Sequence, residues 1–212
     1  MIRFDRPRRY LAFALAGLAG LIDAVGFLSA GGYFVSFMSG NSTRLGVALG
    51  IHPAEGFVPA GLILGFLAGV IGGALVALRA GRHRKPAVLA LVSALLLASA
   101  SARALAAEHA MVLALVVAMG ALNNTFQRGG EVSVGLTYMT GALVRLGQGC
   151  ALWLVGRAEP GWGVWGTLWA GLLCGAVLGA FLQHQLPNGC LWIATICAAA
   201  MALIAFKLPA EA

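Results

Sequence analysis

Two short polar stretches stand out in an otherwise apolar sequence, and their residues are the first candidates for binding a ligand. One is the run Ser39-Gly40-Asn41-Ser42-Thr43, and the other is the pair Thr140-Gly141. Glycine allows a turn and asparagine or serine caps free amide groups, so both stretches are typical of a helix start. A helix N-terminus carries unpaired N–H groups and a partial positive charge, which favours a carboxylate, an oxyanion or another electron-rich group. The stretches predict a small-ligand site; the alternative is that they only cap and pack buried helices.

Three charged residues lie within or beside apolar segments, where charges are costly and are usually paired or functional. Arg44 and Arg145 stand one turn into the helices that the polar stretches begin, so they either add positive potential to the site or extend to a membrane interface. Asp23 is the only acid embedded in an apolar segment, and neutral Asn124 stands at the corresponding place later in the chain. Asp23 either binds a proton or cation coupled to transport or neutralises Arg44 in an ion pair. We favour the ion pair slightly, because an arginine recurs and a second acid does not.

Other chemistries have no support in the residue spacing. The four cysteines and four histidines show no CxxC motif and no metal-ligand spacing. The sequence contains no nucleophile elbow, phosphate loop or paired acidic dyad. We therefore predict a protein that is not an enzyme, has no catalytic residues and holds neither a metal nor a cofactor.

The composition predicts that lipid, rather than a soluble core, surrounds most of the chain. Of the 212 residues, 60% are hydrophobic and 10% are charged, against roughly 45–50% and about 25% in globular domains. Apolar stretches approach the roughly 20 residues that cross a bilayer core of about 30 Å. They cover residues 10–30, 59–78, 87–102, 111–122 and 190–206. A soluble domain of this size has too little interior to bury them.

The formal net charge of +7 is concentrated at the ends of these stretches. Four arginines lie within residues 3–9, and three arginines and a lysine lie within residues 79–85. Both clusters are typical of cytoplasmic anchors under the positive-inside rule. Neither has the interleaved aromatic residues of a nucleic-acid surface. The sequence therefore predicts a multi-pass protein of the bacterial inner (cytoplasmic) membrane, with both termini cytoplasmic, that binds no nucleic acid.

The chain contains an internal repeat. Residues 37–46 match residues 138–147 at an offset of 101, which also relates Leu21 and Asp23 to Leu122 and Asn124. Two glycine stripes, in which glycine recurs at every fourth residue, match at an offset of 106. Gly65, Gly69 and Gly73 form the first, and Gly171, Gly175 and Gly179 form the second. Each half contains an apolar helix, a polar-tipped segment, a glycine-striped helix and a final apolar helix. The expected ranges are 10–31, 33–51, 58–79 and 86–107, then 110–128, 133–156, 163–184 and 189–207.

The placement of basic residues decides whether the polar-tipped segments cross the membrane. If every segment crosses, seven basic residues lie inside and five outside; if the polar-tipped segments dip in and return, eleven lie inside and only Arg103 lies outside. The second distribution is much more typical of membrane proteins. Three crossings per half give the second half the opposite orientation, which makes an inverted repeat of the kind found in many secondary transporters.

The expected fold is an all-α integral membrane protein with six spanning helices and two half-helices. Residues 1–9 form a cytoplasmic N-terminal segment, 10–107 the first membrane repeat, 108–207 the second, inverted repeat and 208–212 a cytoplasmic tail. Each polar-tipped segment enters in extended form, turns at its glycine and returns as a half-helix, so the two tips approach each other near the midplane. The glycine stripes let neighbouring helices pack closely.

Three motifs carry a family resemblance: Gly20-Leu21-Ile22-Asp23-Ala24-Val25-Gly26-Phe27, Phe37-Met38-Ser39-Gly40-Asn41-Ser42 and Tyr138-Met139-Thr140-Gly141. With them the chain resembles, over nearly its whole length, the YoaK-like family of bacterial membrane proteins, catalogued as domain of unknown function 1275. Ser39 replaces the usual threonine of the family's Thr-Gly-Asn signature and keeps its hydroxyl. The resemblance implies a location and a fold but no activity. The extended stretch that feeds a half-helix is also similar in architecture to the substrate site of the uracil-permease and sulfate-permease superfamily.

Together these features predict a secondary transporter or permease for a small, anionic or polar solute. The solute would bind between the two half-helix N-termini at the membrane midplane. The alternative is a non-transporting membrane scaffold or regulatory protein, and an intramembrane enzyme is a distant third. The expected partners are a small-molecule or ion substrate and the lipid bilayer, and a homo-oligomer is left open.

Overall fold

The computed structural model describes residues 6–128, 131–132, 136–137, 139–157 and 160–208. Within these ranges the chain is helical apart from connections and one short hairpin, so the expected all-α class is confirmed. The helices are α1 (Arg6–Ser29), α2 (Met38–Ile51), α3 (Phe57–Ala80), α4 (Arg84–Ala104), α5 (Glu108–Leu122), α6 (Met139–Leu154), α7 (Val164–Gln185) and α8 (Cys190–Lys207), with the 3-10 turns η1 (Pro53–Gly56) and η2 (Gly81–His83). Strands β1 (Gln127–Arg128) and β2 (Glu131–Val132) pair antiparallel, with Gln127 opposite Val132.

The long helices have the length and composition of membrane spans. Four helical stretches of the described chain are long and apolar enough to cross a bilayer: Arg9–Ser29, Pro53–Ala104, Val164–Gln185 and Cys190–Lys207. The second of these contains both α3 and α4. Many large apolar side chains on them remain exposed, among them Leu64, Leu78 and Ile196. Such faces are typical of helices that contact lipid.

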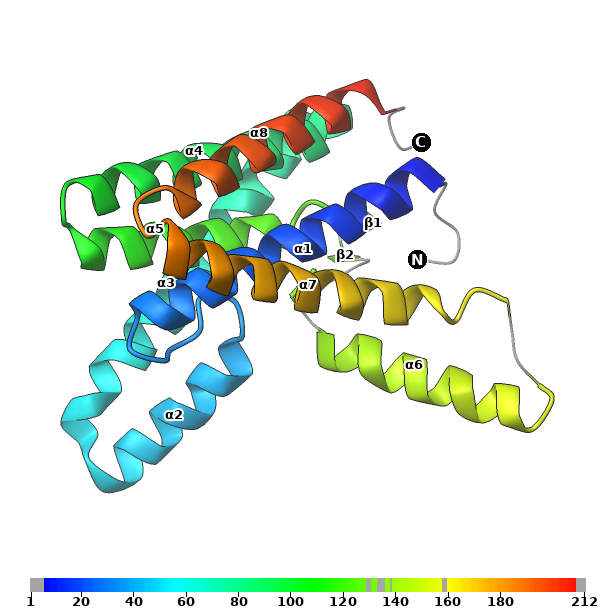
Figure 1. Ribbon diagram of the computed structural model, residues 1–212, viewed down its shortest axis with the longest axis horizontal. Helices are drawn as coiled ribbons and strands as arrows, with labels where there is room; N and C mark the ends of the chain where they lie inside the picture. The colour runs from blue at the N-terminus through cyan, green and yellow to red at the C-terminus, as the bar shows by residue number, and fades with distance from the viewer. Residues whose placement is uncertain (1–5, 129–130, 133–135, 138, 158–159, 209–212) are drawn as a thin grey trace.

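Helices α1 and α7 pack backbone against backbone. A methyl group added at Gly175 would lie 1.9 Å from the carbonyl oxygen of Gly17, and one added at Gly20 would lie 2.0 Å from that of Leu172. Only glycine permits so close an approach, and in lipid close packing is a main source of helix association. The two helices cross in the middle of the molecule (Figure 1).

Helices α3 and α5 repeat this arrangement. A methyl group at Gly69 would lie 2.1 Å from the carbonyl oxygen of Val117, and one at Gly120 would lie 2.1 Å from that of Phe66. The core also contains α4 and α8, which lie side by side. Helix α4 packs on α5 as well. There the buried Ser99 hydroxyl donates to the carbonyl oxygen of Met111 at 3.1 Å.

The helix expected at 110–128 is shorter than predicted, because α5 ends at Leu122. Polar side chains just beyond this point bond to the last carbonyl groups of the helix. Asn123 Nδ2 donates to the oxygen of Met119 at 3.0 Å, and the Thr125 hydroxyl donates to that of Leu122 at 2.7 Å. Such local bonds compete with the helical ones. The chain therefore leaves the helix and forms the β1–β2 hairpin.

The turn of the first polar-tipped segment also lies earlier than expected. Helix α2 begins at Met38, so Ser39, Gly40 and Asn41 form its first turn, and the non-helical stretch is residues 33–37. The corresponding helix, α6, begins at Met139, and residue 138 before it lies outside the described residues. With 14 and 16 residues, α2 and α6 reach only about 21 and 24 Å at 1.5 Å per residue. Both are too short to cross a bilayer core of about 30 Å.

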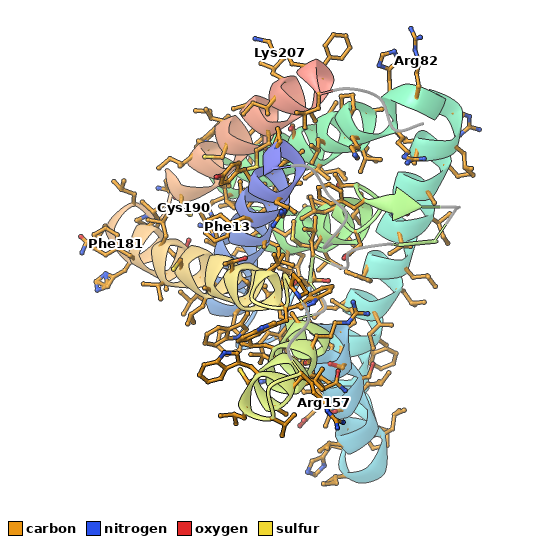
Figure 2. The ribbon with its side chains drawn as sticks, turned by 90° about the vertical axis from the view of Figure 1, so that its right-hand side faces the viewer. Phe13, Arg82, Arg157, Phe181, Cys190 and Lys207 are labelled. Atoms are coloured by element: carbon orange, nitrogen blue, oxygen red, sulfur yellow. The ribbon has the colours of Figure 1, made fainter. Side chains whose placement is uncertain are left out.

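Figure 1 shows how these short helices and the chain ends are arranged. The first turns of α2 and α6 point towards the middle of the molecule, and the two helices run from there towards opposite ends. The first turn of α1 and the last turn of α8 lie at the same end of the bundle. Figure 2, viewed from that end, places Arg82 and Lys207 along one edge, where His83 stacks on Phe206 with ring centroids 5.7 Å apart.

Candidate functional site

The non-helical stretch before α2 is held in place by the side chain of Asp23 on α1. Asp23 Oδ1 accepts hydrogen bonds from the backbone N–H groups of Val35 at 3.0 Å and Ser36 at 2.8 Å. Both residues are buried, so these N–H groups have no access to water. A carboxylate that accepts two backbone N–H bonds stabilises a bend that would otherwise leave them unsatisfied. Asp23 therefore anchors this loop.

Asn41, in the first turn of α2, holds the same loop from the other side. Its side chain pairs with both backbone groups of Phe34: Oδ1 accepts the N–H at 3.1 Å, and Nδ2 donates to the carbonyl at 2.7 Å. Asn41 is 0% exposed. The amide thus replaces the strand partner that this extended backbone lacks.

The remaining polar residues of the first stretch differ in their surroundings. The hydroxyls of Ser42 and Thr43 donate to carbonyl groups one turn back, those of Met38 at 2.8 Å and Ser39 at 3.2 Å. Ser39 itself is exposed, and Phe37, which precedes the helix, provides no side-chain cap. The N-terminus of α2 therefore has no side-chain cap at Phe37, although the Met38 N–H donates to the carbonyl of Ser36 at 3.2 Å, and it lies beside the exposed Ser39 hydroxyl.

Gly40 and Gly141, the two predicted tip glycines, are not in equivalent surroundings. A methyl group at Gly40 would lie 2.7 Å from Cδ1 of Phe37 and 3.1 Å from Cδ2 of Phe34. The ring pair Phe34–Phe37, with centroids 5.3 Å apart, thus requires glycine there. No described residue lies within 4 Å of a methyl group added at Gly141, and both Gly141 and the neighbouring Thr140 are exposed. Gly40 has a packing role, while Gly141 lies at an exposed position of α6.

The expected ion pair between Asp23 and Arg44 is wrong. Asp23 binds backbone N–H groups instead, and neither residue has an ion pair with another described residue. The Arg44 guanidinium stacks over the ring of Tyr33, 4.8 Å from its centroid, and Arg145 stacks over Trp165 at 4.3 Å. Both arginines therefore interact with aromatic faces. The sequence could not indicate this competition, because it depends on where the backbone of residues 33–37 runs.

Asn124 and its neighbour Asn123 have separate roles. Asn124 Nδ2 donates to the carbonyl of Val70 on α3 at 3.0 Å. Asn123 Oδ1 accepts the hydroxyl of Thr137 at 3.2 Å, in the segment that leads to α6. Asn123, rather than the predicted Asn124, thus holds the approach to the second short helix, as Asp23 does for the first.

Arg103, at the end of α4, is a polar centre that the sequence did not single out. Its guanidinium donates to the Ser29 hydroxyl at 2.6 Å, to Gln183 Oε1 at 2.5 Å and to the carbonyl of Pro187 at 2.6 Å. These bonds join α4 to the ends of α1 and α7. Among the described residues no group of three His, Cys, Asp or Glu side chains is placed to hold a metal ion.

Comparison with known proteins agrees with this architecture. The family model described as "Protein of unknown function (DUF1275)" matches residues 11–204. The chain is 37% identical over 200 residues to UPF0700 transmembrane protein RA0705 of Rhizobium meliloti (strain 1021), covering 94% of this chain and 86% of that protein. It is 29% identical over 147 residues to UPF0700 transmembrane protein YoaK of Bacillus subtilis (strain 168), covering 66% and 65% of the two chains. No solved structure matches it. The chain therefore belongs to the DUF1275 family, whose curated relatives are named as transmembrane proteins.

Proposed function

We propose that this protein is a secondary transporter or permease for a small, anionic or polar solute that binds between the first turns of α2 and α6. The observation that carries the proposal is the first turn of α2, which has no side-chain cap at Phe37 and follows a non-helical stretch fixed by Asp23 and Asn41. Non-helical backbone at membrane depth is tolerated where protein or a watery cavity surrounds it. Helix N-termini there favour anionic groups. The residues bind and release the solute without covalent chemistry.

We propose further that the two halves form an inverted repeat. The glycine contacts support it, because Gly20 packs on Leu172 and Gly120 packs on Phe66. Gly120 stands 100 residues after Gly20, and Leu172 stands 106 residues after Phe66, so each contact is the repeat counterpart of the other. The same shift of 100 relates Asp23 to Asn123. Asp23 accepts a hydrogen bond from Ser36, and Asn123 accepts one from Thr137. Both short helices would then be half-helices that return to opposite membrane surfaces, as their directions in Figure 1 suggest.

In this proposal both termini and the connection between α3 and α4 are cytoplasmic. The support is that the start of α1, the end of α8 and the α3–α4 connection lie at one end of the bundle (Figure 1), together with the positive-inside rule. In a background without the native cysteines, Arg82→Cys is expected to resist a membrane-impermeant maleimide in intact spheroplasts, whereas Glu55→Cys is expected to react. Both positions are exposed in the structure. Labelling of Arg82→Cys from outside would contradict the topology.

Gly141→Val is the sharpest test of the ligand site, because Gly141 is exposed and no described residue lies within 4 Å of an added methyl group. We expect the variant to keep the wild-type melting temperature in detergent and to lose about tenfold or more of solute uptake in proteoliposomes, as a side chain there crowds the ligand. The solute would first be identified by thermal stabilisation across a panel of anions and metabolites. Gly40→Val is a poorer test, since it also collides with Phe37.

The matched control is Gly147→Val, in the same helix and also without a described residue within 4 Å, but six residues away from Gly141. It is expected to leave both uptake and stability unchanged. If Gly141→Val transports as well as Gly147→Val, the repeated motif is not a binding site. If no compound in the panel stabilises the protein or is taken up, the scaffold alternative is favoured.

A further inference from the structure

A cavity of ≈ 260 Å³ lies beside α2, away from the first turn that the proposed transport site uses. Its lining comes from the loop before α2, from one face of that helix and from the turn after it: Tyr33, Thr43, Arg44, Val47, Ala48, Ile51, His52 and Glu55. The turn η1 folds back on α2, since a methyl group at Gly56 would lie 3.3 Å from Leu45 and 3.5 Å from Leu49. This fold-back brings Glu55 to the same cavity as Arg44.

Arg44 is prepared to bind an anion in this cavity. The guanidinium stacks over Tyr33 at 4.8 Å and lies 6.0 Å from the centroid of Phe34, which fixes its plane. Stacking occupies the face of the group and leaves its N–H edge available, and that edge matches the oxygens of a phosphate or carboxylate. Arg44 has no hydrogen bond or ion pair to another described residue.

Glu55 provides the opposite charge in the same cavity. It is exposed, and within the described chain its carboxylate makes no hydrogen bond or ion pair. Arg44 and Glu55 therefore line one cavity without pairing with each other. A ligand that carries a negative and a positive group at separate positions would satisfy both, whereas a simple anion would satisfy only one and be repelled by the other.

The surroundings of the cavity favour a lipid as the source of such a ligand. Two of its lining side chains are exposed and apolar, with Val47 56% and Ile51 67% exposed. Apolar groups beside a charged cavity near the end of a membrane helix match the acyl chains and headgroup of a phospholipid. We propose that this cavity binds a zwitterionic phosphate-plus-ammonium group, with the phosphate on Arg44 and the ammonium on Glu55, as in a phosphatidylethanolamine headgroup.

Short-chain phospholipids that differ only in headgroup test the proposal on purified, delipidated protein in detergent. We expect dihexanoyl phosphatidylethanolamine to raise the melting temperature with an apparent Kd about tenfold lower than that of the phosphatidylcholine and phosphatidylglycerol of the same chain length. Choline has no N–H to donate to Glu55, and a glycerol headgroup has no positive charge. Free phosphoethanolamine, inorganic phosphate and phosphocholine form a second arm without acyl chains.

Two variants separate the two charges. Glu55→Gln is expected to abolish the preference for ethanolamine over choline, and Arg44→Gln is expected to weaken every phospholipid about tenfold or more, since a charge-assisted hydrogen bond contributes about 1.5–3 kcal/mol. Glu108→Gln and Arg82→Gln, at exposed positions outside the cavity, are the matched controls. If Arg44→Gln melts early, Arg44→Lys, which keeps the charge, replaces it.

Each outcome bears on the proposal. A preference for ethanolamine that disappears in Glu55→Gln supports it, and equally tight binding of free phosphoethanolamine assigns the site to a soluble zwitterion instead of a lipid. No headgroup preference in the wild-type protein, or one that survives both substitutions, overturns it. Because the assay needs no transport, and Gly141→Val is expected to bind phosphatidylethanolamine normally, failure here is distinguishable from failure of the proposed transport function.

Discussion

Gly69→Ala and Gly175→Ala are expected to destabilise the protein by about 3 kcal/mol or more, while Gly72→Ala leaves it close to wild type. At Gly69 and Gly175 the added methyl group would lie 2.1 and 1.9 Å from a backbone oxygen of the facing helix. Since a backbone atom cannot rotate away, the helices must separate and lose packing along their length. At Gly72 the methyl group meets no described residue within 4 Å, and alanine improves helix propensity by roughly 1 kcal/mol.

The measurement is a thermal melt in one detergent, followed by tryptophan fluorescence, with all three variants compared at equal protein concentration. Gly72 lies three residues after Gly69 in α3, so it controls for the general effect of alanine in this helix. Equal melting temperatures for Gly69→Ala and Gly72→Ala would contradict the close α3–α5 contact. Unequal losses at Gly69 and Gly175 would show that the two glycine contacts differ in strength.

Asp23→Leu is expected to cost about 3 kcal/mol or more, whereas Asp23→Asn is expected to cost only about 1 kcal/mol. Leucine removes the acceptor of two buried backbone N–H groups, and each unsatisfied group costs about 1–3 kcal/mol. Asparagine keeps one oxygen that can accept the two N–H bonds, while it loses the charge and replaces the second carboxylate oxygen with an NH2 group. Asn123 already performs the comparable role beside Thr137 with an amide.

Thermal melts of the two variants beside Thr195→Ala check this prediction. The Thr195 hydroxyl bonds only to the carbonyl of Leu191 one turn back at 2.8 Å, so its loss should be nearly neutral. A large loss for Asp23→Asn, comparable to that for leucine, would mean that the charge itself is required. If Asp23→Asn folds normally but removes an ion dependence of uptake, Asp23 would also couple transport to a proton or cation.

The positions of three long helices could be predicted closely from the sequence, whereas the ranges 10–31 and 86–107 differ by two to four residues at each end from α1 and α4. The expected ranges 58–79, 163–184 and 189–207 differ by one residue or less at each end from α3, α7 and α8. Each is an apolar run bounded by glycine, proline or polar residues, and such boundaries depend on nearby residues alone. The end of α5 was missed because local side-chain bonds at Asn123 and Thr125 decided it against the apolar periodicity.

The candidate site was less predictable, because its contacts join distant parts of the chain. Gly40 lies against the rings of Phe34 and Phe37, a contact that the motif itself does not indicate. Asp23 has a charge that suggests an ion pair, but the bend at Val35 and Ser36 brings free N–H groups closer than Arg44. Local sequence reports residue type and spacing, whereas these outcomes depend on which backbone groups tertiary packing leaves unpaired.

The pairing of α1 with α7 and of α3 with α5 has a consequence for biogenesis. Each glycine helix has its closest partner in the other half of the chain, so the first half cannot complete its packing when it leaves the ribosome. At about 5–20 residues per second, α1 waits in the bilayer for roughly ten seconds or more before α7 is synthesised. During that interval its glycine surface and the loop anchored by Asp23 are open to lipid, chaperones and the membrane insertase. Quality control of this protein should therefore act mainly on nascent chains that have inserted their first half and not yet their second.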